Sequence, residues 1–100
     1  MHATVVHVIS RKPLHDFARR HPDAEGPLRA WHGIMKQMNF GSFSELKRAF
    51  GSADKVGPLT VFNIAGNRYR LIAAVHYNRR RVYVRHVLTH NEYDRGGWQR

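Results

Sequence analysis

The sequence predicts a small α+β domain in which two or three helices cover one face of an antiparallel sheet. A β-branched run opens the chain, apolar residues then recur at helical spacing as far as residue 50, and the second half alternates β-branched and aromatic residues between turn sequences. The sheet would consist of an N-terminal strand and a C-terminal three-stranded meander. One hundred residues support one hydrophobic core but not two, so we expect a single domain over residues 1–94 and a short tail over residues 95–100.

The first half should contain one strand, over residues 4–9, followed by helices. The first helix carries Leu14 and Phe17 behind Pro13, which a first helical turn tolerates. It ends at His21, because the residue before a proline avoids the helical region. The second helix covers residues 27–38 and has an apolar stripe of Leu28, Trp31, Met35 and Met38.

A third, short helix should begin at the capping box formed by Ser42 and Glu45. In this motif the hydroxyl and the carboxylate each accept a hydrogen bond from a backbone amide at the helix start. The helix would bury Phe43, Leu46 and Phe50. We expect residues 52–58 to form a loop.

The second half predicts a meander of three strands, over residues 59–65, 68–77 and 81–88. Gly66 and Asn67 form a two-residue hairpin turn, and residues 78–80 form the second turn. The first turn pairs Ile64 with Tyr69, Asn63 with Arg70 and Phe62 with Leu71. Pairing Tyr77 with Val82 at the second turn places Val75 opposite Val84, Ala74 opposite Arg85 and Leu71 opposite Leu88.

Side chains alternate between the two faces of a strand, so this register assigns each residue to a face. The core face, which the helices should cover, collects Phe62, Ile64, Tyr69, Leu71, Ala73, Val75, Val82, Val84 and Leu88. His86 would also point into the core, opposite Ala73. The opposite face, called the second face below, collects Asn63, Arg68, Arg70, Ile72, Ala74, His76, Arg81, Tyr83 and Arg85.

The second face combines cationic side chains with an aromatic ring. Guanidinium groups bind phosphate oxygens and the ring of Tyr83 can stack on a base, so the pattern favours RNA binding, to which His76 could contribute. Alternatively, Arg70 and Arg85 simply solvate an exposed sheet. Both hairpins assign these two arginines to the same side, which a random scatter of basic residues need not do.

Composition supports a polyanionic partner. Seventeen Lys and Arg residues against seven Asp and Glu give a net charge of +10. A membrane surface is less suitable, because there is no long amphipathic helix with a basic face. No apolar run could span a bilayer, the N-terminus does not resemble a signal peptide, and cysteine is absent, so we expect a cytoplasmic protein without disulfides.

A second capping box, Thr89 with Glu92, should start a helical turn directly after the last strand. Metal-free RNA cleavage needs an acceptor for the 2′-hydroxyl proton, cations at the phosphate and a proton donor for the leaving oxygen. His90 could be the base or the acid, and Tyr93 a proton donor or stacking platform. Equally, His90 could bond within the cap and Tyr93 pack on the sheet edge. Glu92 suits the cap better than a catalytic base. The other histidines lack metal-ligand spacing, so we expect neither metal nor cofactor.

The segments VFNIAGNRYRLIAAV and RVYVRHVLTHNEYD resemble the HigB family of bacterial toxins, within the RelE-like superfamily, and the resemblance extends over residues 1 to about 94. It implies a RelE-like fold whose concave sheet face holds mRNA in the ribosomal decoding site, next to ribosomal RNA. It further implies metal-independent mRNA cleavage that inhibits translation, and a helix-turn-helix antitoxin of the HigA type as partner. The family pattern indicates Asn63, Arg70, Arg85, His90 and Tyr93, with weaker support for Lys55, Arg68 and Glu92.

Two positions depart from the family pattern. Residues 52–58 contain one lysine, Lys55, where many relatives have several basic residues, and Ala65 stands where glycine is common. Two other functions stay open: a ParE-like gyrase-inhibiting toxin on the same fold, and a non-catalytic RNA- or ribosome-binding module. His90 and Tyr93 after the arginine strand favour the nuclease. A helix-turn-helix reading frame beside the gene would favour a toxin of either kind.

Overall fold

The computed structural model describes residues 7–9, 11–37 and 40–99, and it confirms an α+β fold. The strands are β1 (His7–Ile9), β2 (Asp54–Val56), β3 (Leu59–Ile64), β4 (Tyr69–His76) and β5 (Arg81–Thr89). The helices are α1 (Lys12–Arg20), α2 (Glu25–Gln37), α3 (Phe43–Ala49) and α4 (His90–Arg95), with short 3-10 turns η1 (Pro22–Ala24) and η2 (Gly97–Gln99). Residues 4–6 of the predicted first strand and Met38 of the predicted second helix lie outside the described residues.

The five strands form one mixed sheet in the order β1-β5-β4-β3-β2. The prediction of an antiparallel sheet is wrong for β1, which pairs parallel to β5, with His7 opposite Arg81. Only a tight hairpin forces neighbouring strands to be antiparallel, and β1 is separated from β5 by most of the chain. The loop predicted over residues 52–58 contains β2, which pairs with β3 across a tight turn at Gly57 and Pro58.

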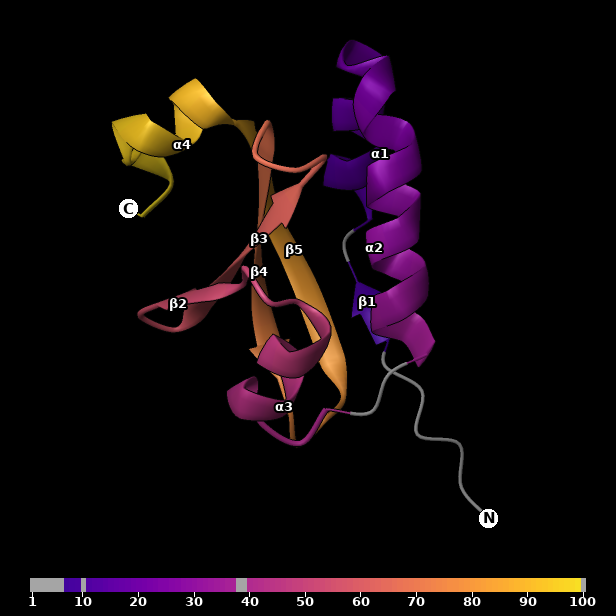
Figure 1. Cartoon of the computed structure of the whole chain (residues 1–100), viewed down its shortest axis with the longest axis vertical. Helices are drawn as coiled ribbons and strands as arrows, with labels where there is room; N and C mark the ends of the chain where they lie inside the picture. The colour runs from indigo at the N-terminus through magenta and orange to yellow at the C-terminus, as the bar shows by residue number, and fades with distance from the viewer. Residues whose placement is uncertain (1–6, 10, 38–39, 100) are drawn as a thin grey trace.

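The sheet has helices α1, α2 and α3 against its core face, whereas α4 lies on the opposite side (Figure 1). Phe62 of β3 is at the centre of the main core. Its ring centroid is 5.4 Å from that of Trp31 in α2 and 5.1 Å from that of Phe50 after α3, and both contacts are edge-to-face. The predicted core face is confirmed for Phe62, Ile64, Tyr69, Leu71, Ala73, Val82 and Val84, and Val75 packs partly buried against the same core.

The predicted β4–β5 register is wrong, for two reasons. The turn begins one residue earlier than predicted, with His76 opposite Arg81, so Val75 pairs with Val82 rather than with Val84; this shift of two residues leaves the faces unchanged. A β-bulge then follows, because Ala73 pairs with Val84 but Ile72 pairs with His86. Arg85 is the extra residue, and the residues after it in β5 lie on the faces opposite to those predicted.

The bulge corrects two residue assignments. Val87 is buried in the main core, where the predicted register placed Leu88, and Leu88 instead packs against a smaller cluster on the second face. His86 pairs with Ile72 and not with Ala73, so it lies on the second face rather than in the core. Because Val84 and Val87 both point into the core, both intervening residues must lie on the second face.

The β3–β4 hairpin has the predicted register, with Ile64 opposite Tyr69 and Asn63 opposite Arg70. Its turn uses the left-handed backbone region at Ala65 (φ 54°) and Gly66 (φ 68°). Glycine adopts this region without strain, whereas an L side chain does not. The position at which the sequence departs from the family's glycine is therefore one of the two left-handed residues.

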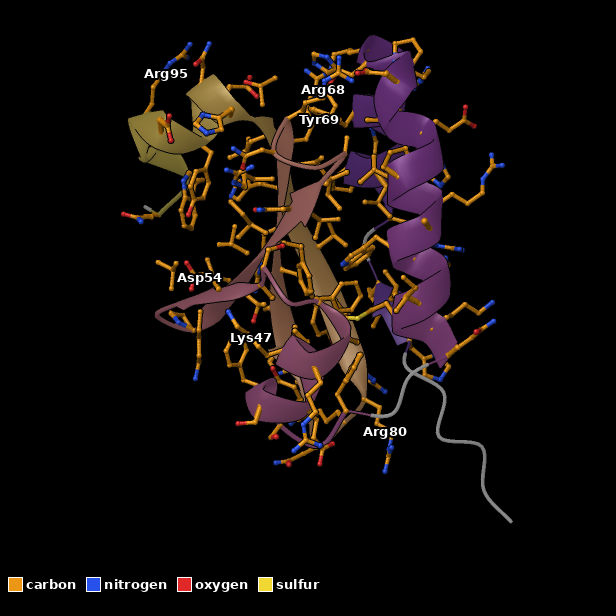
Figure 2. All side chains as sticks on the ribbon, in the orientation of Figure 1. Lys47, Asp54, Arg68, Tyr69, Arg80 and Arg95 are labelled. Atoms are coloured by element: carbon orange, nitrogen blue, oxygen red, sulfur yellow. The ribbon has the colours of Figure 1, made fainter. Side chains whose placement is uncertain are left out.

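Asp23 of η1 connects this hairpin to the helices. The Tyr69 hydroxyl donates to Asp23 Oδ1 at 2.7 Å, and Arg68 Nη1 donates to Asp23 Oδ2 at 2.7 Å. The Tyr69 ring also packs edge-on against Phe17 of α1, at 5.0 Å between centroids. Figure 2 shows Arg68 and Tyr69 at the end of the sheet beside α1. The pKa of Tyr69 is raised, chiefly because its hydroxyl donates to the carboxylate and also because burial disfavours the phenolate.

Gly66→Ala should lower the free energy of unfolding by about 1 kcal/mol, because it places an L side chain in the left-handed region. Gly33→Ala, inside α2, is the matched control and should raise it by up to about 1 kcal/mol. A Cβ atom would meet nothing within 4 Å at either position, so both effects are conformational. Urea unfolding of the two variants tests this, and effects of the same sign would contradict it.

Tyr69→Phe should destabilise the protein in a pH-dependent way. A group whose pKa is higher in the folded state contributes stability that is present below its unfolded pKa, about 10, and is lost as the pH rises through the folded pKa. The difference in melting temperature between wild type and Tyr69→Phe should therefore be constant near neutral pH and shrink in alkaline solution. Other groups that titrate at alkaline pH affect both proteins equally, so their effects cancel in this difference. If the difference in melting temperature does not shrink at alkaline pH, the stabilising role of the Tyr69–Asp23 hydrogen bond is wrong.

Candidate functional site

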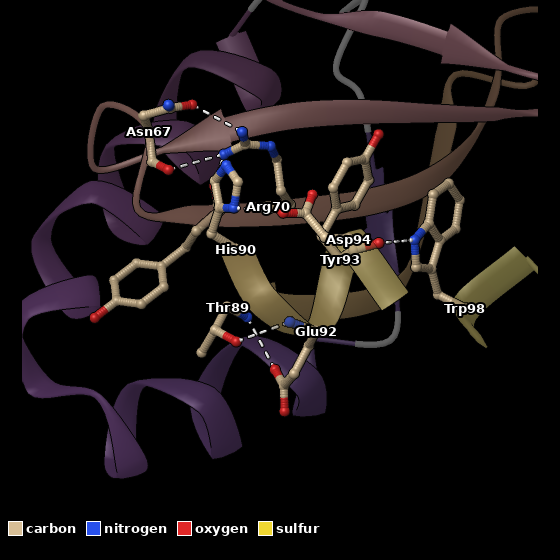
Figure 3. A network of polar contacts seen from close by, with 9 residues as sticks. Asn67, Arg70, Thr89, His90, Glu92, Tyr93, Asp94 and Trp98 are labelled. Carbon is tan, nitrogen blue, oxygen red and sulfur yellow. Dashed lines mark hydrogen bonds and ion pairs between the residues drawn. The ribbon is translucent and has the colours of Figure 1, made fainter. Parts of the chain in front are cut away.

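Four predicted site residues gather on the second face, at the end of the sheet where β4 begins and β5 ends. Arg70 is the second residue of β4, and Asn63 of β3 is its direct cross-strand partner. His90 and Tyr93 belong to α4, which follows β5 without a loop. Figure 3 shows His90 and Tyr93 on α4 facing Arg70. The hairpin, the capping box and the strand end together bring these residues to one place.

Arg70 is a nearly buried cation, with 9% of its surface exposed. Nη1 donates to the backbone oxygens of Asn67 (3.1 Å) and Tyr69 (3.2 Å), and Nη2 donates to Asn67 Oδ1 (2.7 Å). These acceptors are neutral, and no carboxylate of the described residues pairs with it. The guanidinium is thus held in a fixed orientation with its charge uncompensated, which suits it to bind an anion.

The predicted capping box at the start of α4 is confirmed. Thr89 Oγ1 accepts a hydrogen bond from the Glu92 amide at 3.2 Å, and Glu92 Oε1 accepts one from the Thr89 amide at 2.9 Å. The Glu92 carboxylate is therefore engaged at the helix start, as expected from the sequence. His90 is the first residue of the helix, and its backbone amide donates to the Arg68 carbonyl at 3.1 Å.

His90 is paired with Asp94, a residue that the sequence analysis did not single out. His90 Nδ1 lies 3.0 Å from Asp94 Oδ2, and 45% of the His90 side chain is exposed. A carboxylate on Nδ1 orients the ring and selects the tautomer that leaves Nε2 for other chemistry. The spacing of four residues on a helix is the signal that could have indicated this pair.

Tyr93 lies between two planar groups. The Arg70 guanidinium is 5.4 Å from the centre of its ring, and the Trp98 indole is stacked on it with a centroid distance of 5.1 Å and an interplanar angle of 14°. Trp98 belongs to the stretch expected to be a tail, yet it is 8% exposed and packs with Val61 and Ile72 on the second face. The sequence signal for this contact is the Gly96–Gly97 pair, since Gly96 ends α4 in the left-handed region at φ 78°.

Arg85 lies exposed on the second face, as predicted, because it follows the core residue Val84; the bulge changes only the faces of the residues after it. Its neighbour His86 pairs with Ile72, which is two residues along β4 from Arg70 on the same face. The two arginines therefore share one face of the sheet, where Arg70 is held by Asn67 and Arg85 is exposed to solvent.

The remaining predicted binding residues do not join this cluster. Arg68 was expected on the second face, but it turns toward the helices and pairs with Asp23. Lys55 of β2 pairs with Thr60, and Thr60 pairs with the core residue Ala73, so the register places Lys55 on the helix side. His76 and Tyr83 do lie on the second face, as an edge-to-face pair with ring centroids 5.2 Å apart. His76 is about 20 Å from Arg70, because it is six residues further along β4, and Tyr83 is about 13 Å along the strand from Arg70, since it pairs with Ala74.

A cavity of about 560 Å³ lies elsewhere, between α1 and α2, and shares no residue with this cluster. Its lining includes Leu14, Leu28 and His32. The pKa of His32 is lowered, mainly by burial and then by the neighbouring cations of Arg11, Lys36 and His15. The described ranges contain no group of three His, Cys, Asp or Glu residues that could hold a metal ion. No helix within them is long and apolar enough to cross a membrane.

Comparison with known proteins gives a consistent result. The family described as "HigB_toxin, RelE-like toxic component of a toxin-antitoxin system" matches residues 24–96. The chain is 35% identical over 92 residues to the "mRNA interferase toxin HigB" of Escherichia coli K12, covering 89% of this chain and 88% of that protein. It is 29% identical over 93 residues to the "mRNA interferase HigB" of E. coli O6:H1, covering 90% of each.

Thr89→Ala should lower the free energy of unfolding by about 1 kcal/mol, because the Glu92 amide loses its acceptor at the start of α4. Ser42→Ala is the matched control, since Ser42 Oγ accepts the Glu45 amide in the same way at the start of α3. Urea unfolding should show similar losses in both. Amide hydrogen exchange in α4 should accelerate only in Thr89→Ala. Equal acceleration in α4 in both variants would contradict the claim that Thr89 stabilises this helix locally.

Proposed function

Because this chain belongs to the HigB family of RelE-like toxins, we propose that it is an endoribonuclease that cleaves mRNA and so inhibits translation. The observation that carries the proposal is the His90–Asp94 pair beside Arg70 and Tyr93, where a histidine, an oriented carboxylate, a cation and a phenol meet at one end of the sheet. These groups supply the roles that RNA cleavage without a metal requires.

The reaction we propose is attack of a ribose 2′-oxygen on the adjacent phosphorus atom, with departure of the 5′-oxygen of the next nucleotide. His90 exchanges a proton with one of these oxygens through Nε2, while Asp94 holds Nδ1. The guanidinium groups of Arg70 and Arg85 stabilise the extra negative charge on the phosphate. These roles give the cleavage residues His90, Arg70, Arg85 and Tyr93.

The surroundings of Tyr93 narrow its role. Both faces of its ring are covered, one by Arg70 and the other by Trp98, so a nucleotide base cannot stack on it. Its hydroxyl remains available, so of the two roles considered for this residue, proton donor and stacking platform, only that of proton donor is left. His90 and Tyr93 would then act on the two oxygens of one phosphate.

The RNA strand would continue along the second face toward His76 and Tyr83. Arg85 and His86 lie between the two groups, and Asn63 flanks Arg70. A basic sheet with an aromatic pair is suited to unpaired RNA, since cations track the backbone and rings contact bases. Arg68 and Lys55 would contribute at most to general attraction, because they face the helix side.

A toxin of this family has a cognate antitoxin. We propose further that the antitoxin is a helix-turn-helix protein with an acidic surface, which a toxin of net charge +10 would attract. We also propose that cleavage occurs on the translating ribosome in the cytoplasm, where this charge favours contacts with ribosomal RNA.

His90→Ala should abolish growth arrest and reduce mRNA cleavage by about 10²–10⁴-fold, the usual contribution of one acid–base group. Its thermal stability should change little, because the imidazole is half exposed. The measurement is to induce the variant briefly and map transcript 5′ ends, with and without translation of the reporter transcript. His15→Ala, an exposed histidine on α1, is the control and should behave as wild type.

Different outcomes identify different errors. If the wild type cuts untranslated transcripts equally well, ribosome dependence is wrong but the nuclease remains. If the wild type arrests growth without cutting any RNA, a gyrase-inhibiting toxin or a non-catalytic ribosome-binding module becomes the better account. If His90→Ala cuts RNA normally, the proton-transfer role belongs to another group.

A further inference from the structure

Three planar side chains form a continuous stack on the second face. The Arg70 guanidinium lies 5.4 Å from the Tyr93 ring centre, and the Trp98 indole lies on the other side of that ring at 5.1 Å, tilted by 14°. Figure 3 shows Trp98 beside Tyr93 at the end of α4. Two of these residues belong to the proposed cleavage site, and the third comes from beyond the predicted domain boundary.

Trp98 is anchored independently of Arg70. Its indole packs on Val61 of β3 and Ile72 of β4, which are 3% and 0% exposed. Nε1 donates to the Tyr93 carbonyl at 3.0 Å, so the same residue is bound through its backbone and stacked through its ring. The left-handed turn at Gly96 brings η2 back across α4 to make these contacts.

The short helix α4 depends on such an anchor. It has six residues, none of them fully buried, and a helix of this length is not stable by itself in water. The capping box secures its first turn, whereas Trp98 secures its last turn against the sheet. Without the indole, one face of the Tyr93 ring would meet solvent and the ring could leave the guanidinium.

We propose that Trp98 is a positioning residue for RNA cleavage: it holds the Tyr93 ring against Arg70 and so fixes the phenol and the guanidinium relative to the reacting phosphate. This role rests on the proposed nuclease function. Trp98 itself touches neither RNA nor the reacting atoms. It acts through Tyr93, because a displacement of about 1 Å in a catalytic group can cost about 100-fold in rate.

The test compares Trp98→Ala with Trp98→Phe, which keeps a ring on Tyr93 but lacks the Nε1 donor. Cleavage of a translated transcript is followed at limiting and at saturating toxin concentration. Trp98→Ala should lower the maximal rate by about 10–100-fold with little change in the concentration giving half-maximal rate. Trp98→Phe should restore most of that rate.

A second measurement tests whether Trp98 is stacked on the Tyr93 ring in the protein without RNA. NMR should show the Tyr93 ring protons shifted by the indole ring current in the wild type, and this shift should be lost in Trp98→Ala. Trp98→Ala should lower the melting temperature, because the indole is buried with Val61 and Ile72, but both variants should keep a cooperative melting transition above the temperature of the cleavage assay.

The outcomes separate this role from the nuclease function. A wild type that cuts no RNA would overturn the proposed function and this role with it. An active wild type together with a fully active Trp98→Ala would overturn only the positioning role. If both variants lose activity in proportion to a lost melting transition, Trp98 is a structural residue and the proposal is wrong. An unchanged Tyr93 shift in Trp98→Ala would equally contradict it.

Discussion

Burial of β4 on both faces is the constraint on which the rest of the structure depends. Six consecutive residues, from Tyr69 to Ala74, are buried, although only one face of the sheet is covered by the large helices. The other face is closed at one end by Trp98, Tyr93 and Leu88. Arg70 belongs to this doubly covered strand, so its guanidinium is desolvated by the same packing that holds the sheet together. The oxygens that accept hydrogen bonds from this guanidinium are neutral, so its positive charge is not balanced. A phosphate group could balance it.

Local rules in the sequence were sufficient for much of the fold. The β3–β4 register followed from Gly66 and Asn67, the end of α1 from Pro22, and the start of α4 from Thr89 and Glu92, because each depends on residues within one turn. The direction of β1 and the existence of β2 depend on contacts between distant segments, which local patterns do not encode. The bulge at Arg85 changed the faces of β5 because one extra residue has no signature in an alternating pattern.

In the candidate site, too, residues placed by local sequence were predicted, whereas residues placed by contacts between elements were not. Asn63, Arg70, His90 and Tyr93 come together because a hairpin and a capping box, both predictable, position them. Asp94 and Trp98 were missed because their partners become apparent only when α4 and the chain after it are placed on the sheet. Arg68 was assigned to the second face by alternation and Lys55 was indicated by the family resemblance, but the ion pair with Asp23 and the register of β2 place them on the helix side. Neither signal distinguished the two faces of the sheet at these positions.

The β2 edge of the sheet has a consequence for contacts between copies of the chain. β2 is an outer strand of three residues and carries Asp54 and Lys55. Short, charged edges offer few unpaired backbone groups to another sheet, which is how many β-proteins avoid edge-to-edge aggregation. The β2 edge is therefore a poor template for pairing with another copy of the chain, and the buried strand β4 lies two strands further in.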